Sequence, residues 1–493
     1  MHLCTLDQLA QVCHGTLSGQ TPRTTPIGRI VCDSRAIKAG DVFAALPGTR
    51  HNGATFVSDA LERGALGCLV ERSSSEKQSD DCDPYVQNNL RLLHNHTPAP
   101  FIIYVNNTHQ AIRDLAVWHR NQFSGVVIGV TGSVGKTTTR ELIHTVLNRK
   151  LRGTRSPKNY NNELGLPLSV LQSTPDDQYL VLELGARQPG EIRELAKICC
   201  PHIGVITRIS ETHLENFNSL EAIAHTKAEL AHELPENGLL IINGDDPQLS
   251  AVCQNIPQRI IRVGMNTDND WCASDIRVLP ERLEFTAHGK FQERFTVPVN
   301  GDHHVIGILC AIAVATEMKL SVEDISTALA VFNPPQNRCQ TIELGPITVI
   351  DDSYNSSPAS MTAALRLLSR WPTEGRKILI TGSMLELGTE SAQLHRQIGN
   401  QCAETFDLVI TCGKEARKLA DGALLGGLHS QSVRTFNDVS PLCQHLPNTL
   451  LKGDVVLVKG SRASAMNRVV ESLVTAYNDE SQPCCSTLHV SHS

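Results

Sequence analysis

The stretch from Val126 to Thr139, VVIGVTGSVGKTTT, constrains the fold of this chain more than any other part. It begins with a short apolar, β-branched run, which is typical of a buried strand. It then passes through glycines into a helix-like segment from Thr138 to Leu147. In such a unit, backbone N–H groups and the positive end of the helix dipole converge on one point. The stretch therefore predicts an anion-binding turn at the end of a buried strand.

Two side chains suit this turn to a nucleoside triphosphate. Lys136 supplies a mobile charge for the β- and γ-phosphates, and the Thr137 hydroxyl can bind a phosphate-bound Mg²⁺. The strict pattern G-x-x-x-x-G-K-[ST] would need glycine where Val130 stands. An ordinary strand–turn–helix with a surface lysine is the alternative. Because Gly-Lys-Thr directly follows a buried strand, we favour nucleotide binding by Gly132, Ser133, Val134, Gly135, Lys136, Thr137 and Thr138.

The overall composition is that of a multidomain globular protein. Its 493 residues exceed what one core can hold, so two to four domains are expected. A net charge of -7 argues against a general nucleic-acid binder. The N-terminus lacks a secretory pattern and no apolar run approaches the length of a membrane span. None of the sixteen cysteines forms C-x-x-C, so zinc ribbons and thioredoxin-like sites lack their usual signature. With neither a signal nor a span, we expect a cytoplasmic protein with reduced, mostly buried thiols.

The first unit, residues 1 to about 105, alternates short strands and helices. Thr5 can cap the first of these helices. Residues 73–98 are rich in Ser, Asp, Gln, Asn and His, which predicts an irregular surface insertion. Strands are predicted over residues 30–35, 40–46, 67–70 and 101–105, and helices over residues 6–12, 55–64 and 109–119.

The second unit, residues 106–335, contains the glycine-rich turn. Short apolar strands are predicted at 126–130, 179–183 and 203–207, with helical segments between them. This alternation predicts a mostly parallel sheet. Ligands collect at the carboxyl ends of such strands. We therefore expect the turn, Glu183 and the segment with His213 to lie at one edge of the sheet.

The third unit, residues 336–477, repeats this alternation and is expected to be a smaller Rossmann-like domain without a G-x-G-x-x-G fingerprint. The polar residues 478–493 are expected to be a disordered tail. The whole chain is therefore predicted to be an α/β protein of three domains. The strands of the third unit are predicted over residues 347–350, 377–381, 407–411 and 454–458.

Three further side chains could act beside the phosphate-binding turn. Glu183 ends an otherwise apolar strand, and a phosphate-bound Mg²⁺ takes one or two carboxylates. His213, in a loop after the third strand, could hold a second metal or contact an acyl phosphate. Lys227 lies in a helix-like segment, residues 219–234, that Ser219 can cap, and it shares a helix face with alanines. Taken alone, it favours a lysine that covers apolar surface, but in a cleft its neutral amine could take up CO₂ as a carbamate.

Several motifs together resemble the Mur ligases of peptidoglycan synthesis. The resemblance spans nearly the whole chain and includes a motif, Asp33-Ser-Arg35, similar to the family's N-terminal UDP-sugar-peptide module. Two C-terminal segments, DDSYNSSP from Asp351 and GSMLELG from Gly382, resemble the MurF type. The D-N-P-R motif of the enzyme that adds the diamino acid is absent. The main family motifs are Thr131–Thr139, Asn161–Gly165, Leu182–Ala186, His213–Glu215 and Thr226–Leu230.

The resemblance implies an ATP-dependent ligase that joins D-alanyl-D-alanine to UDP-N-acetylmuramoyl-tripeptide through an acyl phosphate. It implies three α/β domains: a UDP-substrate module, a P-loop ATPase domain and a Rossmann-like ligase domain. No nucleic acid or membrane segment is expected, and the enzyme would be a monomer. The implied roles are catalysis by Lys136, Lys227, His213 and Arg338, and magnesium binding by Thr137 and Glu183 at one site and by His213 and carbamylated Lys227 at another. ATP would be contacted by the turn, His304 and Asp352, and the two other substrates by Ser34, Arg35, Asn162, Tyr354 and Asn355.

The sequence departs from the family at the pattern G-x-H-N-x-x-N, whose asparagines lie near adenine. Here it runs from Gly301 to Gly307, with His304 and Gly307 in place of the two asparagines. His304 can stack on a base or donate a hydrogen bond. These losses motivate a second hypothesis, a non-catalytic nucleotide-binding relative. A sibling ligase with a different acceptor is a third, which the segment from Asp351 to Pro358 disfavours.

Overall fold

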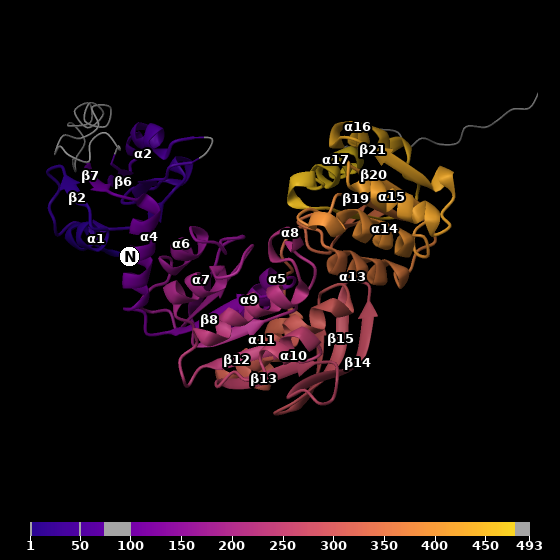
Figure 1. Ribbon diagram of the computed structural model, residues 1–493, viewed down its shortest axis with the longest axis horizontal. Coiled ribbons are helices and arrows are strands. Elements are labelled where there is room, and N and C mark those ends of the chain that lie inside the picture. The colour runs from indigo at the N-terminus through magenta and orange to yellow at the C-terminus, as the bar shows by residue number, and fades with distance from the viewer. Residues whose placement is uncertain (1, 49–50, 73–99, 479–493) are drawn as a thin grey trace, which may run out of the picture.

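The computed structural model describes residues 2–48, 51–72 and 100–478, which form three α/β domains in chain order (Figure 1). The N-terminal domain, the central domain and the C-terminal domain follow one another from indigo to yellow. The predicted insertion at 73–98 lies outside the described residues, as does the predicted tail beyond Asn478. Within the described part of the chain, no helix is long and apolar enough to cross a membrane.

The N-terminal domain is built on a five-stranded sheet in the order β2-β7-β6-β5-β4. Only β2 is antiparallel to its neighbour. Thr5 caps α1 as predicted, in a reciprocal pair with Gln8 that satisfies backbone donors at the helix start. The bounds are β1 Cys4–Thr5, α1 Leu6–Val12, β2 Thr16–Ser18, β3 Pro26–Ile27, β4 Ile30–Val31, η1 Ser34–Ala36, β5 Val42–Ala45, η2 Gly53–Phe56, α2 Val57–Glu62, β6 Gly67–Glu71 and β7 Phe101–Val105.

One N-terminal prediction is wrong. A strand was expected over residues 30–35, but β4 ends at Val31 and a 3₁₀ turn, η1, follows. The cause is local: the Asp33 carboxylate accepts a hydrogen bond of 3.0 Å from the backbone N–H of Arg35. Aspartate offers the backbone such a turn in place of a sheet ladder. Ser34 and Arg35 therefore lie on a turn.

Helix α4 (Thr108–Arg120) connects the first domain to the second. Its first half, with Ile112 and Leu115, packs in the N-terminal core, whereas Ala116 packs in the core of the central domain. At its end, the buried Arg120 donates to the carbonyls of Cys199 (2.6 Å) and Cys200 (2.8 Å). Carbonyls at a helix end have no partner within the helix, so Arg120 satisfies those of α7.

The central domain holds a nine-stranded sheet in the order β16-β15-β14-β13-β12-β11-β8-β10-β9. The three predicted strands are confirmed, and β8 lies between β10 and β11 in parallel register. All three are buried along nearly their whole length, as expected of parallel strands covered on both faces. The strands are β8 Val126–Thr131, β9 Gly153–Arg155, β10 Tyr179–Glu183, β11 Ile203–Ile206, β12 Leu239–Asn243, β13 Arg259–Gly264, β14 Trp271–Leu279, β15 Arg282–His288 and β16 Gln292–Val297.

The helices of this domain enclose that sheet. The helix after the glycine-rich turn, α5, begins at Lys136, two residues before the prediction. Ser219 caps α9 as expected. Helix α11 is buried on almost every side, which makes it a core helix. The helices are α5 Lys136–Leu147, α6 Gly165–Val170, α7 Glu191–Cys199, α8 Leu214–Phe217, α9 Leu220–His232, α10 Pro247–Val252, η3 Asp302–His304, α11 Val305–Glu317 and α12 Val322–Ala330.

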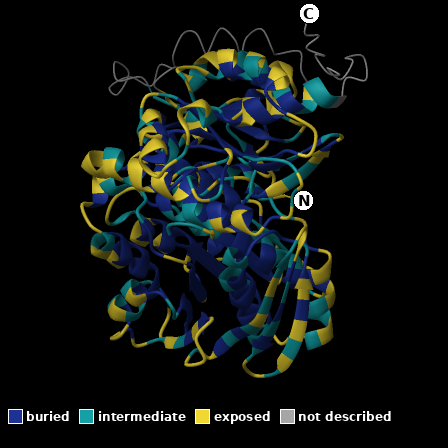
Figure 2. Cartoon of the chain, turned by 90° about the vertical axis from the view of Figure 1, so that its right-hand side faces the viewer, coloured by how far each residue is buried: buried dark blue, intermediate teal, exposed yellow. Residues whose placement is uncertain are grey.

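The C-terminal domain has a six-stranded sheet in the order β17-β18-β22-β19-β20-β21, antiparallel only at β17. Figure 2 shows buried residues filling this domain and the central one, with exposed residues on their outer surfaces. The bounds are β17 Gln340–Leu344, β18 Ile347–Asp352, α13 Pro358–Ser369, β19 Lys377–Gly382, η4 Gly388–Glu390, α14 Ser391–Cys402, β20 Leu408–Cys412, α15 Ala416–Leu425, η5 Ser430–Ser432, β21 Val433–Phe436, α16 Val439–His445, η6 Leu446–Asn448, β22 Val455–Lys459, η7 Arg462–Ser464 and α17 Asn467–Asn478.

Replacing Arg120 with leucine should destabilise the central domain. The change leaves the buried carbonyl of Cys199 and the partly buried carbonyl of Cys200 without their donor, at a cost of about 2–4 kcal/mol in the free energy of unfolding. Arg113→Leu on the same helix is the matched control, because its ion pair with Glu194 is largely exposed and contributes less than about 1 kcal/mol. Urea unfolding of the two variants measures the difference, and equal losses would contradict it.

Candidate nucleotide and substrate site

A cleft of about 2310 Å³ lies between the central and C-terminal domains. Its central-domain wall is the turn after β8 together with the carboxyl ends of β10 and β11. Its other wall includes the loop before α13 and the end of β22. The cleft therefore lies at the sheet edge that the sequence predicted, where the carboxyl ends of parallel strands meet.

The glycine-rich turn needs two of its glycines. Gly132 has φ +143°, and a Cβ there would lie 2.1 Å from Oγ1 of Thr207. Gly135 has φ +85° and forms the N-cap of α5. Val130, by contrast, is an interior residue of β8, paired with Glu183 and Val205. The turn starts only after the strand, which explains why valine is tolerated where the strict motif has glycine.

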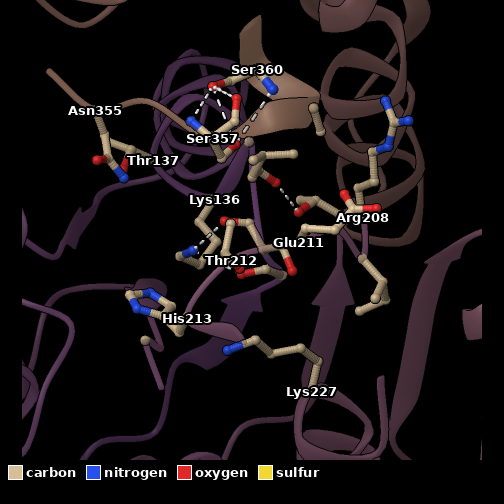
Figure 3. A pocket seen from close by; sticks show the side chains of 18 of the residues that line it. Lys136, Thr137, Arg208, Glu211, Thr212, His213, Lys227, Asn355, Ser357 and Ser360 are labelled. Atoms are coloured by element: carbon tan, nitrogen blue, oxygen red, sulfur yellow. Dashed lines mark hydrogen bonds between the residues drawn. The ribbon is translucent and has the colours of Figure 1, made fainter. Parts of the chain in front are cut away.

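Lys136 lies folded over this turn. Its Nζ donates to the carbonyls of Gly132 (2.7 Å) and Ser133 (3.0 Å), as Figure 3 shows. Burial lowers the pKa of Lys136, and the nearby Glu183 carboxylate opposes that effect. The amino group is thus held inside the cleft beside a turn of backbone N–H groups, an arrangement suited to binding phosphate.

Glu183 is the centre of a buried polar network. Its Oε2 accepts from Thr137 Oγ1 (2.9 Å) and from Arg140 (3.0 Å), and its Oε1 accepts from Asn161 (2.8 Å). Glu183 is only 2% exposed. A buried carboxylate needs such partners, because its desolvation is costly without them. Neither Arg140 nor Asn161 was predicted. Asn161 stands in a quoted motif, but its neighbour Asn162 was expected to act.

Arg338 links the two walls of the cleft. It lies in the segment between α12 and β17, and its guanidinium donates to Thr137 Oγ1 at 3.0 Å. The same group stacks 4.3 Å from the ring centre of Tyr354, a cation–π contact that fixes its direction. The structure therefore brings Arg338, predicted from the third unit, to the phosphate-binding turn of the second.

Asp352 ends β18 and pairs with Lys459 at the end of β22. Lys459 is only 1% exposed, and it also donates to the carbonyl of Asn355 at 3.0 Å. A buried ammonium requires such acceptors. Lys459 was not predicted to be a site residue, since a lysine at a strand end gives no distinct signal. The pair fixes the loop that carries Tyr354 and Asn355 along the cleft.

His213 and Lys227 project toward the same space below Lys136 (Figure 3). His213 comes from the loop before α8, and burial lowers its pKa although Glu386 of the C-terminal domain lies beside it. Lys227 comes from α9. The sequence predicted this convergence from two segments that are separate in the chain.

Lys227 is buried, so the prediction favoured for it alone, a lysine covering surface, is wrong. It is 2% exposed, and its Nζ donates to the Ala186 carbonyl at 3.3 Å. Its helix face carries alanines that let α9 approach its neighbours closely, which draws the amine inside. Burial, together with the charge of Lys136, lowers the pKa of Lys227 to about 7. A substantial fraction of the amine is therefore neutral near neutral pH.

His304 and Gly307 occupy the beginning of α11. The rings of His304 and His303 lie 4.1 Å apart between centres, and burial lowers the pKa of His304 well below its usual value. His304 lines the cleft with Asp352. A Cβ on Gly307 would lie 2.7 Å from Oγ1 of Thr139. Glycine at this position therefore lets α11 pack closely against α5.

The remaining predicted contacts lie further away. Ser34 and Arg35 belong to the N-terminal domain and do not line the cleft. Ser34 is buried, and Arg35 pairs with Asp33 at 2.8 Å on the surface. Asn162 lines the cleft, but its side chain accepts from the backbone N–H of Gly165 (2.9 Å) and so shapes the start of α6.

Few of these side chains could hold a metal ion without additional ligands from the substrate. Among the described residues, no group of three or more His, Cys, Asp or Glu side chains is arranged as a metal site. Thr137 and Glu183 offer one hydroxyl and one carboxylate beside the phosphate-binding turn. Mg²⁺ is usually bound in this way, by one or two protein oxygens together with substrate phosphates.

Comparisons with known proteins agree along the chain. Family models match at residues 26–115 (Mur ligase family, catalytic domain), 130–315 (Mur ligase middle domain) and 337–462 (Mur ligase, glutamate ligase domain). The UDP-N-acetylmuramoyl-tripeptide–D-alanyl-D-alanine ligase of Bacillus subtilis (strain 168) is 32% identical over 474 residues, covering 95% of this chain and 98% of the relative.

Solved structures agree with these matches. A crystal structure of MurF from Acinetobacter baumannii superposes with a TM-score of 0.82 at 28% identity, over 96% of this chain and 99% of that one. The MurF ligase from Thermotoga maritima in complex with ADP gives 0.75 at 29% identity, over 91% and 98%.

The P-loop at the sheet edge and the third domain across the cleft define a multidomain P-loop nucleotide-binding enzyme. The sequence matches and the structural superpositions identify one family within that class. The chain belongs to the Mur ligase family, in its MurF branch.

Replacing Gly132 with alanine should weaken nucleotide binding, measured as the affinity for ADP, by about 10- to 100-fold. The new Cβ meets Thr207, and the left-handed backbone adds strain of about 1–3 kcal/mol at the phosphate-binding turn. Gly345→Ala is the control, since Gly345 also has a positive φ but open space around it. Calorimetric titration with ADP measures both affinities. Unchanged binding in Gly132→Ala would show that the turn tolerates a side chain.

Proposed function

We propose that this protein joins D-alanyl-D-alanine to UDP-N-acetylmuramoyl-tripeptide with the conversion of ATP to ADP and phosphate, in peptidoglycan precursor synthesis. The relatives are named for this activity, and the matches cover nearly the full length of each. The observation that carries the proposal is the convergence on Thr137. Glu183 from the neighbouring strand and Arg338 from the far side of the cleft both hydrogen-bond to its hydroxyl.

The reaction proceeds in two displacements. A carboxylate oxygen of the tripeptide attacks the γ-phosphorus of ATP, and ADP leaves, which gives an acyl phosphate. The amine of the dipeptide then attacks the acyl carbon, loses a proton, and phosphate departs as the amide forms. Neither displacement needs a protein nucleophile. The protein must instead position the reactants and neutralise charge, which Lys136 and Arg338 are placed to do.

The three substrates divide between the domains. ATP lies on the turn after β8, with its base and ribose toward His304 and Asp352. The dipeptide approaches from the C-terminal wall, near Tyr354 and Asn355. The UDP end of the third substrate lies on the N-terminal domain around Ser34 and Arg35, and its peptide extends past Asn162 into the cleft. A single chain supplies all of these groups, which supports an enzyme that acts as a monomer. Its proposed location is the cytoplasm, as for precursor synthesis by its relatives.

Mg²⁺ would be held by Thr137 and Glu183 together with phosphate oxygens, and it supplies charge neutralisation at the transferred phosphoryl group. The residues fit this role because hydroxyl and carboxylate oxygens are the ligands that magnesium prefers. Arg140 and Asn161 hold the carboxylate in place through hydrogen bonds to its two oxygens. The carboxylate is thus oriented before any ligand binds.

Lys227 would act as a carbamate. Its neutral amine attacks the carbon of CO₂, a nitrogen–carbon bond forms as a C=O π bond opens onto oxygen, and the nitrogen loses a proton, so a neutral amine becomes an anion. The lowered pKa of Lys227 supports this step, because only the neutral amine is nucleophilic. The product carboxylate and His213 would together hold a second Mg²⁺, which the side chains in their unmodified form could not do.

A non-catalytic relative is the alternative favoured by His304 and Gly307. The packing of Gly307 against Thr139 gives that residue a structural reason, and the side chains around the phosphate-binding turn are intact. A ligase with a different acceptor is the other alternative. The segment from Asp351 to Pro358, on the C-terminal wall of the cleft, resembles the MurF type in sequence, which favours the dipeptide.

The proposal is tested by phosphate release from ATP and Mg²⁺ with UDP-N-acetylmuramoyl-tripeptide, with and without D-alanyl-D-alanine. We expect release that requires both substrates and a product heavier by the dipeptide in mass spectrometry. Single amino acids in place of the dipeptide serve as the acceptor control. ATP binding without phosphate release would support the non-catalytic alternative, and turnover with another acceptor would support the sibling ligase.

Replacing Lys227 with alanine should lower turnover by at least about 100-fold, because the carbamate that would hold the second Mg²⁺ near the reacting phosphate can no longer form. Lys150→Ala, which removes an exposed lysine paired with Asp324, should have no effect. With ¹³C-labelled CO₂, the wild-type protein should show a carbamate signal that the Lys227 variant lacks. The signal should fall as the pH drops below about 7, since protonation then removes the nucleophile. Full activity in Lys227→Ala would exclude the carbamate.

A further inference from the structure

Two loops in strained conformations meet between the central and C-terminal domains. His213, before α8, has φ +56°, and Glu386, after β19, has φ +63°. Neither is glycine or asparagine, and such residues adopt the left-handed region at a cost of about 1–3 kcal/mol unless their surroundings fix them. Strain of this kind at two facing positions suggests that the contact between them serves a function.

The two loops fit each other closely. His213 Nδ1 lies 2.5 Å from Glu386 Oε2. The backbone N–H of Glu215 points to the carbonyl of Glu386 at 3.4 Å. Gly388, with φ +58°, lies against Glu215, where a Cβ would come within 3.2 Å of its Cα. The carboxylate is therefore brought to the imidazole by backbone as well as side-chain contacts.

The carboxylate determines which ring nitrogen of His213 carries the proton. An ionised carboxylate only accepts hydrogen bonds, so the imidazole must present N–H from Nδ1 toward it. That nitrogen is buried, and the Glu386 carboxylate is the acid that lies beside it. The two groups are close but not aligned as a hydrogen bond, and no other described residue hydrogen-bonds to Nδ1. With the proton on Nδ1, Nε2 of the neutral ring keeps its lone pair. Figure 3 shows the ring facing the space between the amino groups of Lys136 and Lys227.

We propose that Glu386 is a positioning residue that acts across the domain interface, by holding the His213 ring in the Nδ1–H form with Nε2 turned to the reaction site. The role of Nε2 as a metal ligand rests on the proposed function, but the pairing itself rests on the contact. Histidines that bind metals usually donate their other N–H to a carboxylate or carbonyl, which fixes the ring and its tautomer.

The origin of the carboxylate makes this arrangement conditional. His213 belongs to the central domain and Glu386 to the C-terminal domain, so the ring is oriented only while the two domains are in contact. The His213 ring is therefore oriented for the reaction only when the C-terminal domain is docked. The same domain carries Tyr354 and Asn355, near which the dipeptide is proposed to bind. A catalytic ligand fixed by one domain alone would lack this dependence.

The first test is the tautomer of His213. Long-range ¹H–¹⁵N correlation spectra of the histidine-labelled protein, assigned with His213→Gln, should show Nδ1 protonated and Nε2 bare in the wild type. In Glu386→Gln the preference should weaken, because an amide can donate as well as accept. A bare Nδ1 in the wild type would overturn the proposal. This measurement does not depend on ligase activity.

The second test is Mn²⁺ binding to the enzyme–ADP complex, followed by electron paramagnetic resonance. Loss of an outer-shell partner typically weakens metal binding by about 10- to 100-fold, and we expect that loss in Glu386→Gln. Glu390→Gln is the control, since Glu390 is exposed four residues along the same loop. In the His213→Gln background, Glu386→Gln should cause no further loss, because the two residues act as one unit.

Three results would overturn the proposal. These are equal Mn²⁺ affinity in Glu386→Gln and Glu390→Gln, a full additional loss in the His213→Gln background, or a larger radius of gyration of Glu386→Gln in small-angle scattering. A larger radius of gyration would show that Glu386 serves only to dock the C-terminal domain and does not position the His213 ring. If the wild type forms no product with the tripeptide and dipeptide substrates, the proposed ligase fails, while the tautomer still decides the pairing.

Discussion

The hydroxyl of Thr137 is the point on which the rest of the site depends. It donates to the buried Glu183 carboxylate and accepts from Arg338, so helix α5, strand β10 and the segment between α12 and β17 meet at one atom. A buried carboxylate is stable only when its oxygens are satisfied, and here Arg140 and Asn161 complete that requirement. The nine-stranded sheet places the carboxylate there, because β10 lies directly beside β8.

Features that depend on a local pattern could be predicted from the sequence. The three buried strands, the Thr5 and Ser219 caps and the phosphate-binding turn each have a signal within a few residues. Because parallel strands end at one sheet edge, their order along the chain also placed Glu183 near the turn. The α/β class and the family followed from the same segments.

Features that depend on tertiary contacts could not be predicted. Nothing in the sequence distinguishes Asn161 from Asn162, since only the backbone direction decides which amide meets Glu183. Lys459 and Glu386 act through partners more than a hundred residues away. The strands β14–β16, antiparallel to one another, were not predicted, although buried positions alternate with more exposed ones along β15. Their place at the end of the sheet depends on the parallel pairing of β14 with β13. The Asp33 turn overrode a strand pattern by one hydrogen bond.

The segment between α12 and β17 has a mechanical consequence. It is the covalent link between the central and C-terminal domains, and Arg338 lies within it. Any rotation that separates the domains must therefore withdraw the guanidinium from Thr137 in the same movement. Opening the cleft would move the positive charge of Arg338 away from the bound phosphates and so lower the affinity for ADP. The release of products and the return of Arg338 to its open position would then occur in one step, and the rate of domain opening would set the rate of both.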